Sequence, residues 1–152
     1  MVVIPTFNEA ANIARLIPQL LELNVDLLVV DDSSTDGTPE IVSEFAKQSE
    51  RVHLLSRPGK MGLGSAYREG FARLLKENYQ LIIQMDADGS HRVTDLRRMM
   101  EFQQDHPACD VVIGSRWISG GAVENWPKKR ELLSRMANFY SRTLLGLKVK
   151  DN

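Results

Sequence analysis

Short apolar runs alternate with segments of helical pattern along the whole chain, and this alternation restricts the possible folds more than any other feature. The runs fall at Val2–Ile4, Leu27–Val30, Val52–Leu55, Leu81–Ile83 and Val111–Ile113. Each has the length and apolar content of a buried strand, and each is followed by polar turn residues and then by a helix-like stretch. Strands that alternate with helices pair in parallel, with helices over both faces of the sheet. The sequence therefore predicts a doubly wound α/β sheet.

Two residues give local detail to the first predicted helix. Asn8 stands just before the helical pattern begins, so it is a candidate N-cap. Pro18 lies inside the apolar repeat that runs from Ile13 to Leu21. Because proline removes a backbone donor and clashes with the preceding turn, we expect it to kink or divide this helix.

Size and composition favour a single soluble domain over residues 1–152. The chain is 43% apolar and 26% charged, and its net charge of −1 gives no reason to expect nucleic acid as a partner. Cys109 is the one cysteine, which excludes an internal disulfide and fits a reducing compartment. No signal peptide is visible and no apolar run approaches membrane-spanning length. These features predict a cytoplasmic protein.

Charged side chains follow three of the five predicted strands. Asp31 and Asp32 follow the second strand, Asp86 and Asp88 the fourth, and Arg116 the fifth. Ligands of open α/β sheets bind at the carboxyl ends of the strands, so we expect these side chains to meet in one crevice. Carboxylates, a divalent cation and an arginine together suit a diphosphate.

Asp86 and Asp88 have the spacing of a metal-binding pair. Along a strand, residues two apart point the same way, so both carboxylates could face one hard cation. An isolated Asp-x-Asp is more often a loop aspartate that caps the next helix. The same alternative applies to Asp31 and Asp36, and it is weaker for the whole set of acids than for either residue alone.

Two further features near the predicted crevice have more than one interpretation. The loop Gly62–Gly64 could cradle a phosphate, but it lacks the third glycine of a dinucleotide fingerprint and the Lys-Ser/Thr of a P-loop, which favours a tight turn. His91, three residues after Asp88, either packs at the helix start or contacts the site.

The segment from Lys128 to Leu145 is a predicted basic amphipathic helix. Its apolar set includes Leu132, Leu133, Met136 and Tyr140. Such a helix either docks on the sheet with a solvated basic face or lies against anionic lipid headgroups.

Five motifs, in order and spacing, resemble the family 2 glycosyltransferases of GT-A fold. They are VVIPTFNE (2–9), VVDDSSTDGT (29–38), QMDADGSH (84–91), GSRW (114–117) and GGAVENWPKKRELLSRMAN (120–138). The first two are shared across the wider family. The last is similar to the polyprenol-phosphate (dolichol-phosphate) mannose synthase group in its bacterial form. The resemblance covers essentially the whole chain and implies a Rossmann-like GT-A sheet.

The resemblance implies a nucleotide pocket at the ends of the first two strands. The residues that would line the guanine and ribose are Pro5, Phe7, Glu9, Val30 and Asp32. Relatives often have tyrosine where Phe7 stands, so a phenol contact present in them is absent here.

It also implies a cation site, for Mg2+ or Mn2+, on the fourth strand. Asp86, Ala87 and Asp88 would meet the sugar diphosphate, with Asp88 as the principal metal ligand and Asp86 beside it. Ser90 stands where relatives place a third ligand, a glutamine, and is a weaker ligand than that residue.

The implied catalytic set is Asp88, Arg116 and Arg130, with the two arginines on the phosphate groups of donor and acceptor. The family pattern continues past Asn152 with a strand that lies antiparallel inside the sheet, so the chain is expected to be truncated at its C-terminus.

The function implied by the resemblance is transfer of mannose from GDP-mannose to a polyprenyl phosphate, with inversion, at the cytoplasmic face of a membrane to which the protein binds peripherally. The acceptor is a phosphate monoester with a second pKa of about 6, so it is largely anionic at neutral pH and needs no general base. One alternative is a related transferase that uses UDP-glucose or another nucleotide sugar. The other is a non-catalytic α/β module with an acidic pocket.

Overall fold

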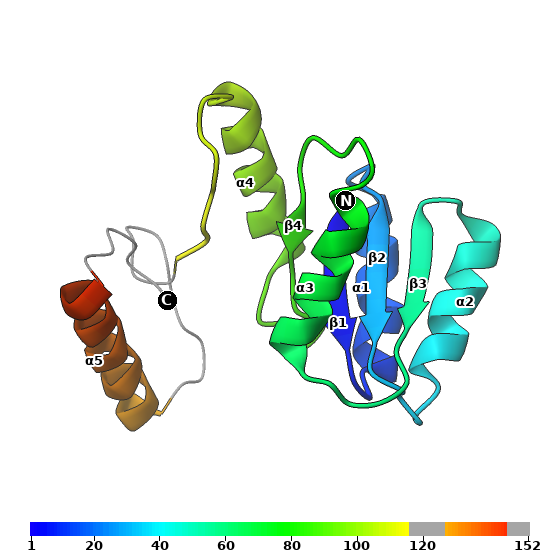
Figure 1. The fold of residues 1–152 in the computed structure, drawn as a ribbon, viewed down its shortest axis with the longest axis horizontal. Coiled ribbons are helices and arrows are strands. Elements are labelled where there is room, and N and C mark those ends of the chain that lie inside the picture. The colour runs from blue at the N-terminus through cyan, green and yellow to red at the C-terminus, as the bar shows by residue number, and fades with distance from the viewer. Residues whose placement is uncertain (116–126, 146–152) are drawn as a thin grey trace. The chain divides into compact units, whose positions relative to one another are not determined.

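The structure is a computed structural model that describes residues 1–115 and 127–145 (Figure 1). Contacts between residues divide the chain into two units, Met1–Arg97 and Arg98–Asn152, which are described separately below. The first unit contains the sheet and the predicted nucleotide and metal residues.

A parallel sheet forms the centre of the first unit. Its strands are β1 (Val2–Thr6), β2 (Leu27–Asp31), β3 (Val52–Ser56) and β4 (Ile83–Gln84), and their order is β3-β2-β1-β4. All three pairings are parallel. β1 and β2 are buried along their whole length, as expected for central strands covered on both faces. The predicted α/β class is confirmed.

Helices connect the strands and follow the last of them. They are α1 (Ala10–Leu21), α2 (Thr38–Gln48), α3 (Leu63–Leu74), α4 (Val93–Asp105) and α5 (Lys128–Leu145). In Figure 1, α3 lies in front of the sheet and α1 lies behind it, while α2 packs against β3. The crossover connections thus cover both faces, as in a doubly wound sheet.

α1 runs without a break through Pro18, so of the two predicted effects of this proline, a kink or a division, the division is wrong. The helix buries Ile13, Ile17 and Leu20 completely. Burial of each such side chain contributes about 1.5–3 kcal/mol, which offsets the cost of about 3 kcal/mol for an interior proline.

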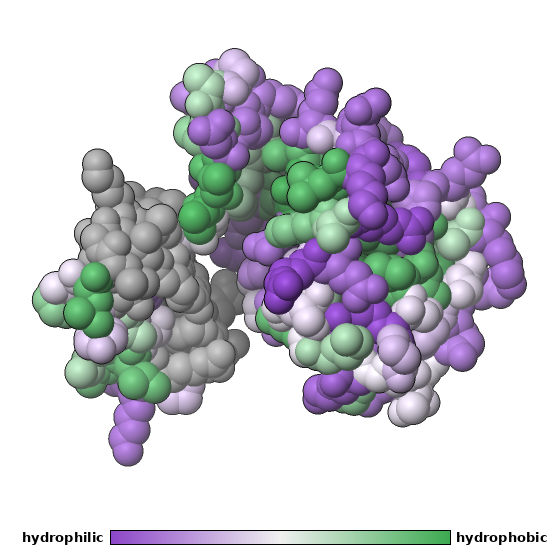
Figure 2. Space-filling view, in the orientation of Figure 1, coloured by the Kyte–Doolittle hydropathy of each residue, from purple (hydrophilic) through white to green (hydrophobic). Residues whose placement is uncertain are grey.

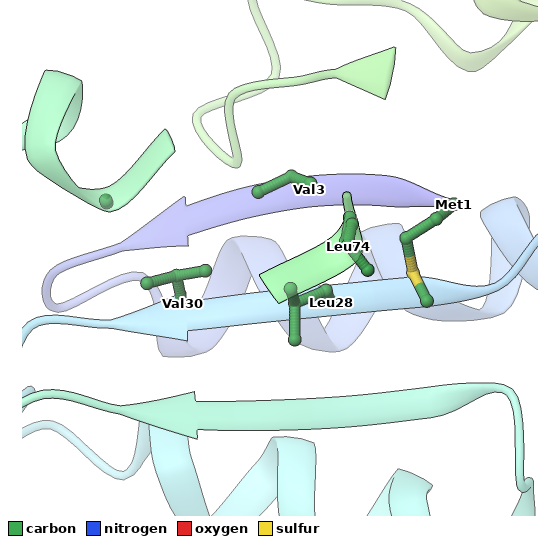
Figure 3. Packing of buried hydrophobic residues seen from close by; sticks show 6 residues of the cluster. Met1, Val3, Leu28, Val30 and Leu74 are labelled. Carbon is green, nitrogen blue, oxygen red and sulfur yellow. The ribbon is translucent and has the colours of Figure 1, made fainter. Parts of the chain in front are cut away.

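One cluster of the hydrophobic core lies between the sheet and α3. Val3, Leu28 and Val30 of the strands form this cluster with Leu74 of α3 (Figure 3), and Ala66 of the same helix belongs to it. α3 approaches β1 closely at Gly70, where an added Cβ would lie 2.8 Å from Cγ1 of Val3. This contact fixes the helix, including Tyr67 one turn earlier, against the sheet.

The last two predicted strands differ from the structure. β4 covers only Ile83–Gln84, and Leu81 is exposed. The fifth strand is wrong: residues 111–113 form no strand, and the side chains of Val111 and Ile113 are 69% and 51% exposed. A strand is stable only where a neighbour pairs with it, and no strand of the described part of the chain pairs with these residues.

Candidate active site

The first three strands end at the same level of the sheet. In the register of the ladder, Thr6 of β1 pairs with Asp31 of β2, and Asp31 pairs with Ser56 of β3. β4 joins the other side of β1, where Val3 pairs with Gln84. The loops after β1, β2 and β4 therefore leave the sheet along one edge, where ligands of parallel α/β sheets bind.

Asp31 holds the loop that follows β2. Its carboxylate is fully buried and accepts hydrogen bonds from the Thr6 hydroxyl (2.8 Å) and from the Ser34 hydroxyl (2.6 Å) and amide (2.9 Å). A buried carboxylate is stable only when its oxygens are paired, and these three donors pair both of them. Asp31 therefore acts as a structural residue of the loop.

Asp36 links the same loop to the start of α1. One oxygen accepts the Ala10 amide at 2.9 Å, and the other accepts the amide (3.1 Å) and hydroxyl (2.6 Å) of Thr38. The Thr38 hydroxyl, followed by the Ala10 amide, lowers the pKa of Asp36. Asp36 thus bonds the first amides of α1 and α2, although the N-cap positions of these helices are Glu9 and Gly37.

Asn8 does not cap α1, so that prediction is wrong. Its backbone has a positive φ of 58°, and its side-chain oxygen accepts the Thr35 amide at 2.9 Å instead. The backbone amide of Asn8 donates to the Ser34 hydroxyl. The loops after β1 and β2 are consequently joined to each other in both directions.

Asp32 is the centre of a buried ion pair. It is 5% exposed, and its Oδ1 accepts Nε of Arg57 at 2.6 Å and also contacts the terminal guanidinium nitrogen Nη2. Oδ2 accepts the amides of Met61 and Gly62, each at 2.9 Å. The carboxylate therefore anchors both ends of the segment from Arg57 to Gly62. Gly62 is the N-cap of α3 and Leu63 is its first residue, so the predicted turn at Gly62–Gly64 is a helix start.

Arg57 lies at the same edge of the sheet, and the sequence does not predict its role there. It is 3% exposed and also contacts the Ser65 hydroxyl (2.8 Å), the Gly62 carbonyl (3.2 Å) and Glu69 (3.5 Å). A lone arginine in a turn carries no sequence signal for burial. Only its contact with Asp32, 25 residues earlier in the chain, distinguishes it.

The structure brings the five predicted nucleotide residues to one edge. Pro5 and Val30 pair across β1 and β2 and are both buried, so they form the floor of this edge. Asp32 lies beneath the segment 57–62. Phe7 and Glu9 lie on the loop between β1 and α1.

Phe7 and Glu9 offer the accessible surface at this edge. The ring of Phe7 is 38% exposed, and Nζ of Lys60 lies 4.0 Å above its centroid. Glu9 is half-buried, and its Oε2 accepts the side-chain amide of Asn12 at 2.6 Å. A partly exposed aromatic ring with a carboxylate two residues away suits a flat polar ring such as a nucleobase.

Asp86 and Asp88 lie in a bend, because β4 ends at Gln84. The argument that alternate strand residues point the same way therefore does not apply to this pair. Ala87 between them is 5% exposed, whereas Asp86 is half-buried and Asp88 is exposed. A buried alanine thus separates two carboxylates that are more accessible to solvent.

Each of these carboxylates has one oxygen that accepts a hydrogen bond. Oδ1 of Asp86 accepts the Tyr67 phenol at 2.7 Å, and the Asp86 amide donates to Nδ1 of His91 at 3.1 Å. Oδ1 of Asp88 accepts the Ser90 amide at 2.9 Å. His91 thus contacts the acidic loop, which decides between the two interpretations of this residue.

Tyr67 is the second residue of this edge that the sequence did not reveal, because it reads as part of the apolar face of a helix. Burial, then the hydrogen bond to Asp86, then the charges of Asp86 and Asp88 raise the pKa of the Tyr67 phenol. The phenol is therefore within electrostatic range of both carboxylates and remains a hydrogen-bond donor at physiological pH.

The donor set of the loop fits a hard divalent cation only in part. Within the described residues, no three or more His, Cys, Asp or Glu side chains are grouped to hold a metal ion. Asp86, Asp88 and the exposed hydroxyl of Ser90 supply oxygen ligands alone. Mg2+ typically binds one or two carboxylates together with substrate phosphates, so these residues fit a cation whose shell a phosphate completes.

The two predicted arginines are not located by the structure. Arg116 lies outside the described residues. Arg130 lies in α5, but its side chain is not described.

α5 carries a row of exposed apolar side chains in the second unit. These residues, each 60–74% exposed, are Leu132, Leu133, Met136, Phe139, Tyr140 and Leu144, and apolar surface on this helix is visible in Figure 2. No helix in the described part of the chain is both long and apolar enough to cross a membrane.

Comparison with known proteins adds a family model and close relatives. The model described as "Glycosyl transferase family 2" matches residues 1–152. A polyprenol monophosphomannose synthase of Mycolicibacterium smegmatis is 42% identical over 99% of this chain and 57% of its own length. An undecaprenyl-phosphate mannosyltransferase of Micrococcus luteus is 39% identical over 99% of this chain and 62% of its own length. The chain thus spans about three fifths of these relatives.

A solved structure is similar in fold. The mannosyltransferase PcManGT of Pyrobaculum calidifontis, in complex with GDP-Man and Mn2+, matches 69% of this chain and 32% of its own. The TM-score is 0.54 and the sequence identity is 26%.

Proposed function

Because the chain belongs to glycosyl transferase family 2, we propose that it carries the catalytic domain of an inverting mannosyltransferase of GT-A fold. The reaction transfers mannose from GDP-mannose to a polyprenyl phosphate and gives polyprenyl-phosphate mannose and GDP. The names of the two curated relatives support the acceptor class, and the GDP-Man in the Pyrobaculum structure supports the donor. Residues 1–152 belong to a single catalytic domain.

The observation that carries this proposal is the position of the acidic loop. Asp86 and Asp88 follow a strand that pairs with β1, and the partly exposed ring of Phe7 follows β1 itself. A nucleoside diphosphate has its base at one end and its phosphates at the other. An aromatic face with a carboxylate at Glu9, and a cation-binding loop on the adjacent strand, match those two ends.

The nucleotide pocket is formed by the residues at the ends of β1 and β2. Phe7 presents its ring to the base, and Glu9 accepts hydrogen bonds from base or ribose. Pro5 and Val30 support the pocket from below. Asp32 holds the neighbouring segment 57–62 in place through Arg57, so its contribution to the pocket includes the order of that wall.

The diphosphate is held at the acidic loop with Mg2+ or Mn2+. Asp88 is the principal ligand, and Asp86 and Ser90 complete the protein's share. A bound divalent cation neutralises charge that develops on the leaving diphosphate. The Mn2+ of the Pyrobaculum complex supports this assignment.

The chemical step needs no proton transfer. A phosphate oxygen of the acceptor attacks the anomeric carbon, the bond from that carbon to the diphosphate breaks, and GDP leaves with the electron pair. Since the acceptor is already anionic, the protein's task is to align it and to stabilise the leaving group. Arg116 and Arg130 contact the phosphates in this scheme.

A direct assay tests the reaction and the donor. The purified protein is incubated with Mn2+, polyprenyl phosphate and either GDP-mannose or UDP-glucose, and the glycolipid is identified by mass spectrometry. We expect a mannolipid from GDP-mannose and at least a tenfold lower rate with UDP-glucose. A faster reaction with UDP-glucose would show that GDP-mannose is the wrong donor. The absence of product with either donor would argue against an enzyme.

Peripheral attachment to the cytoplasmic face of a membrane is the second part of the proposal. The exposed apolar residues of α5 and its basic residues, including Lys128 and Lys129, suit an anionic lipid surface. Each cation near such a surface adds about 1 kcal/mol, so Lys128→Ala with Lys129→Ala should weaken binding to anionic vesicles about 30-fold at low salt. Activity on a short, water-soluble acceptor should persist in this variant, whereas Arg130→Ala should lower it. The reverse pattern would exchange these roles.

A further inference from the structure

Asp86 is held by residues from two different elements. The phenol of Tyr67 on α3 donates to its Oδ1 at 2.7 Å, and His91, just before α4, accepts its backbone amide at 3.1 Å. Side chain and backbone of one residue are thus fixed independently. Among the described residues, by contrast, Asp88 is held by its own loop alone, through the Ser90 amide.

The hydroxyl of Tyr67 is not required by the packing of its ring. The ring packs against the core cluster beneath α3, and its centroid lies 6.2 Å from that of Phe71. A phenylalanine would fill the same space. Tyr67 as a whole is half-buried, and its hydroxyl makes the hydrogen bond to Asp86, so the hydroxyl is the group that acts on the acidic loop.

A hydrogen bond to one oxygen of a carboxylate restricts where the other oxygen can point. The bond from Tyr67 restricts rotation of the Asp86 side chain and occupies Oδ1, and within the described residues no hydrogen bond to Oδ2 is formed. Carboxylates that bind metals are commonly oriented by hydrogen bonds of this kind. α3 is itself fixed on the sheet at Gly70, so the phenol is a rigid reference point.

We propose that Tyr67 is a positioning residue for the donor site: it holds Asp86 so that Oδ2 faces the divalent cation and the diphosphate. The proposal rests on the function proposed above. It adds a residue of α3 to a site otherwise formed by the strand-end loops. It also explains why a tyrosine rather than a phenylalanine stands on the inner face of that helix.

Tyr67→Phe and Tyr79→Phe form a matched pair for the test. Both rings pack against the same core cluster, but the hydrogen bond to Asp86 belongs to Tyr67. GDP binding is measured by calorimetry with and without Mn2+, beside the thermal unfolding of each variant. We expect Tyr67→Phe to weaken Mn2+-dependent GDP binding about 10-fold or more, as for other residues that orient metal ligands. Metal-free GDP binding and Tm should stay at the wild-type values, and Tyr79→Phe should change none of the three.

A double-mutant cycle separates positioning from a structural role. Tyr67→Phe is combined with Asp86→Asn, and Mn2+-dependent GDP affinity is measured for all four proteins. If Tyr67 acts through Asp86, its removal has little further effect in the Asp86→Asn background, whereas a general structural role gives additive losses. Additive losses, or a Tyr67→Phe affinity within twofold of wild type, would overturn the role of Tyr67 alone. A wild-type protein without Mn2+-dependent GDP binding would overturn the proposed function as well.

Discussion

The loops after β2 and β4 both carry two aspartates at the same edge of the sheet, yet the two pairs are used differently. Asp31 and Asp32 are 0% and 5% exposed, and donors occupy both oxygens of each carboxylate. Asp86 is half-buried and Asp88 is exposed, and each has a single oxygen that accepts a hydrogen bond within the described residues. The first pair builds the edge, and the second pair leaves oxygens available for a ligand.

The difference shows which property of a carboxylate identifies a ligand site. Charge and strand-end position are common to both pairs, so neither separates them. Occupancy of the oxygens does, because a carboxylate already saturated by an arginine and backbone amides has little capacity left for a cation.

Stability should separate the two loops most strongly. Asp32→Ala leaves Arg57 buried without its principal partner, and breaking a buried pair from one side costs about 3–5 kcal/mol. Asp88→Ala removes an exposed carboxylate, and such surface changes stay within about 0.5 kcal/mol. Urea unfolding of both variants measures the contrast. Equal stabilities would mean that the Asp32–Arg57 pair does not hold the edge together.

For nucleotide binding the order is reversed, and the larger effect is expected from the acidic loop after β4. Asp88→Asn keeps the size of the side chain but removes the charge that binds the cation, so we expect Mn2+-dependent GDP affinity to fall about 100-fold, or about 2.8 kcal/mol. The fold should be unchanged in circular dichroism. Calorimetry with and without Mn2+ is the measurement, and GDP affinity unchanged by the substitution would remove Asp88 from the metal site.

Much of the fold follows from the sequence because its signals are local. The runs at β1, β2 and β3 are mainly apolar and bounded by turn residues, and all three form strands. The run Val111–Ile113 is apolar and β-branched but has no paired neighbour in the described chain, and it is not a strand. Composition gives the tendency of a segment to be extended, whereas pairing depends on residues elsewhere in the chain.

The site was predictable in outline for the same reason. Its acidic residues were found from their positions after strands, and the family expected from the motifs is confirmed. Arg57 and Tyr67 were not found, because each is defined by a contact 19–25 residues away in the chain. The roles of the predicted ligand residues stay predictions that the substitutions above address.

The smallest expected effect concerns Asp36, the remaining acid of the structural loop. Thr38 and Ala10 donate to its carboxylate and lower its pKa, so the ionised form is favoured in the folded protein. A group of this kind stabilises the fold above its unfolded pKa of about 3.9, and that stabilisation is lost as the pH falls through the lower folded value. Asp36→Ala should therefore unfold at a lower urea concentration than wild type at pH 7. The difference between the two unfolding midpoints, the gap, should narrow as the solution is made more acidic than pH 3.9. Mn2+-dependent GDP affinity should change little, since Asp36 belongs to the loop that builds the edge. A gap that stays constant down to pH 2 would show that the ionised carboxylate is not what joins α1 to α2.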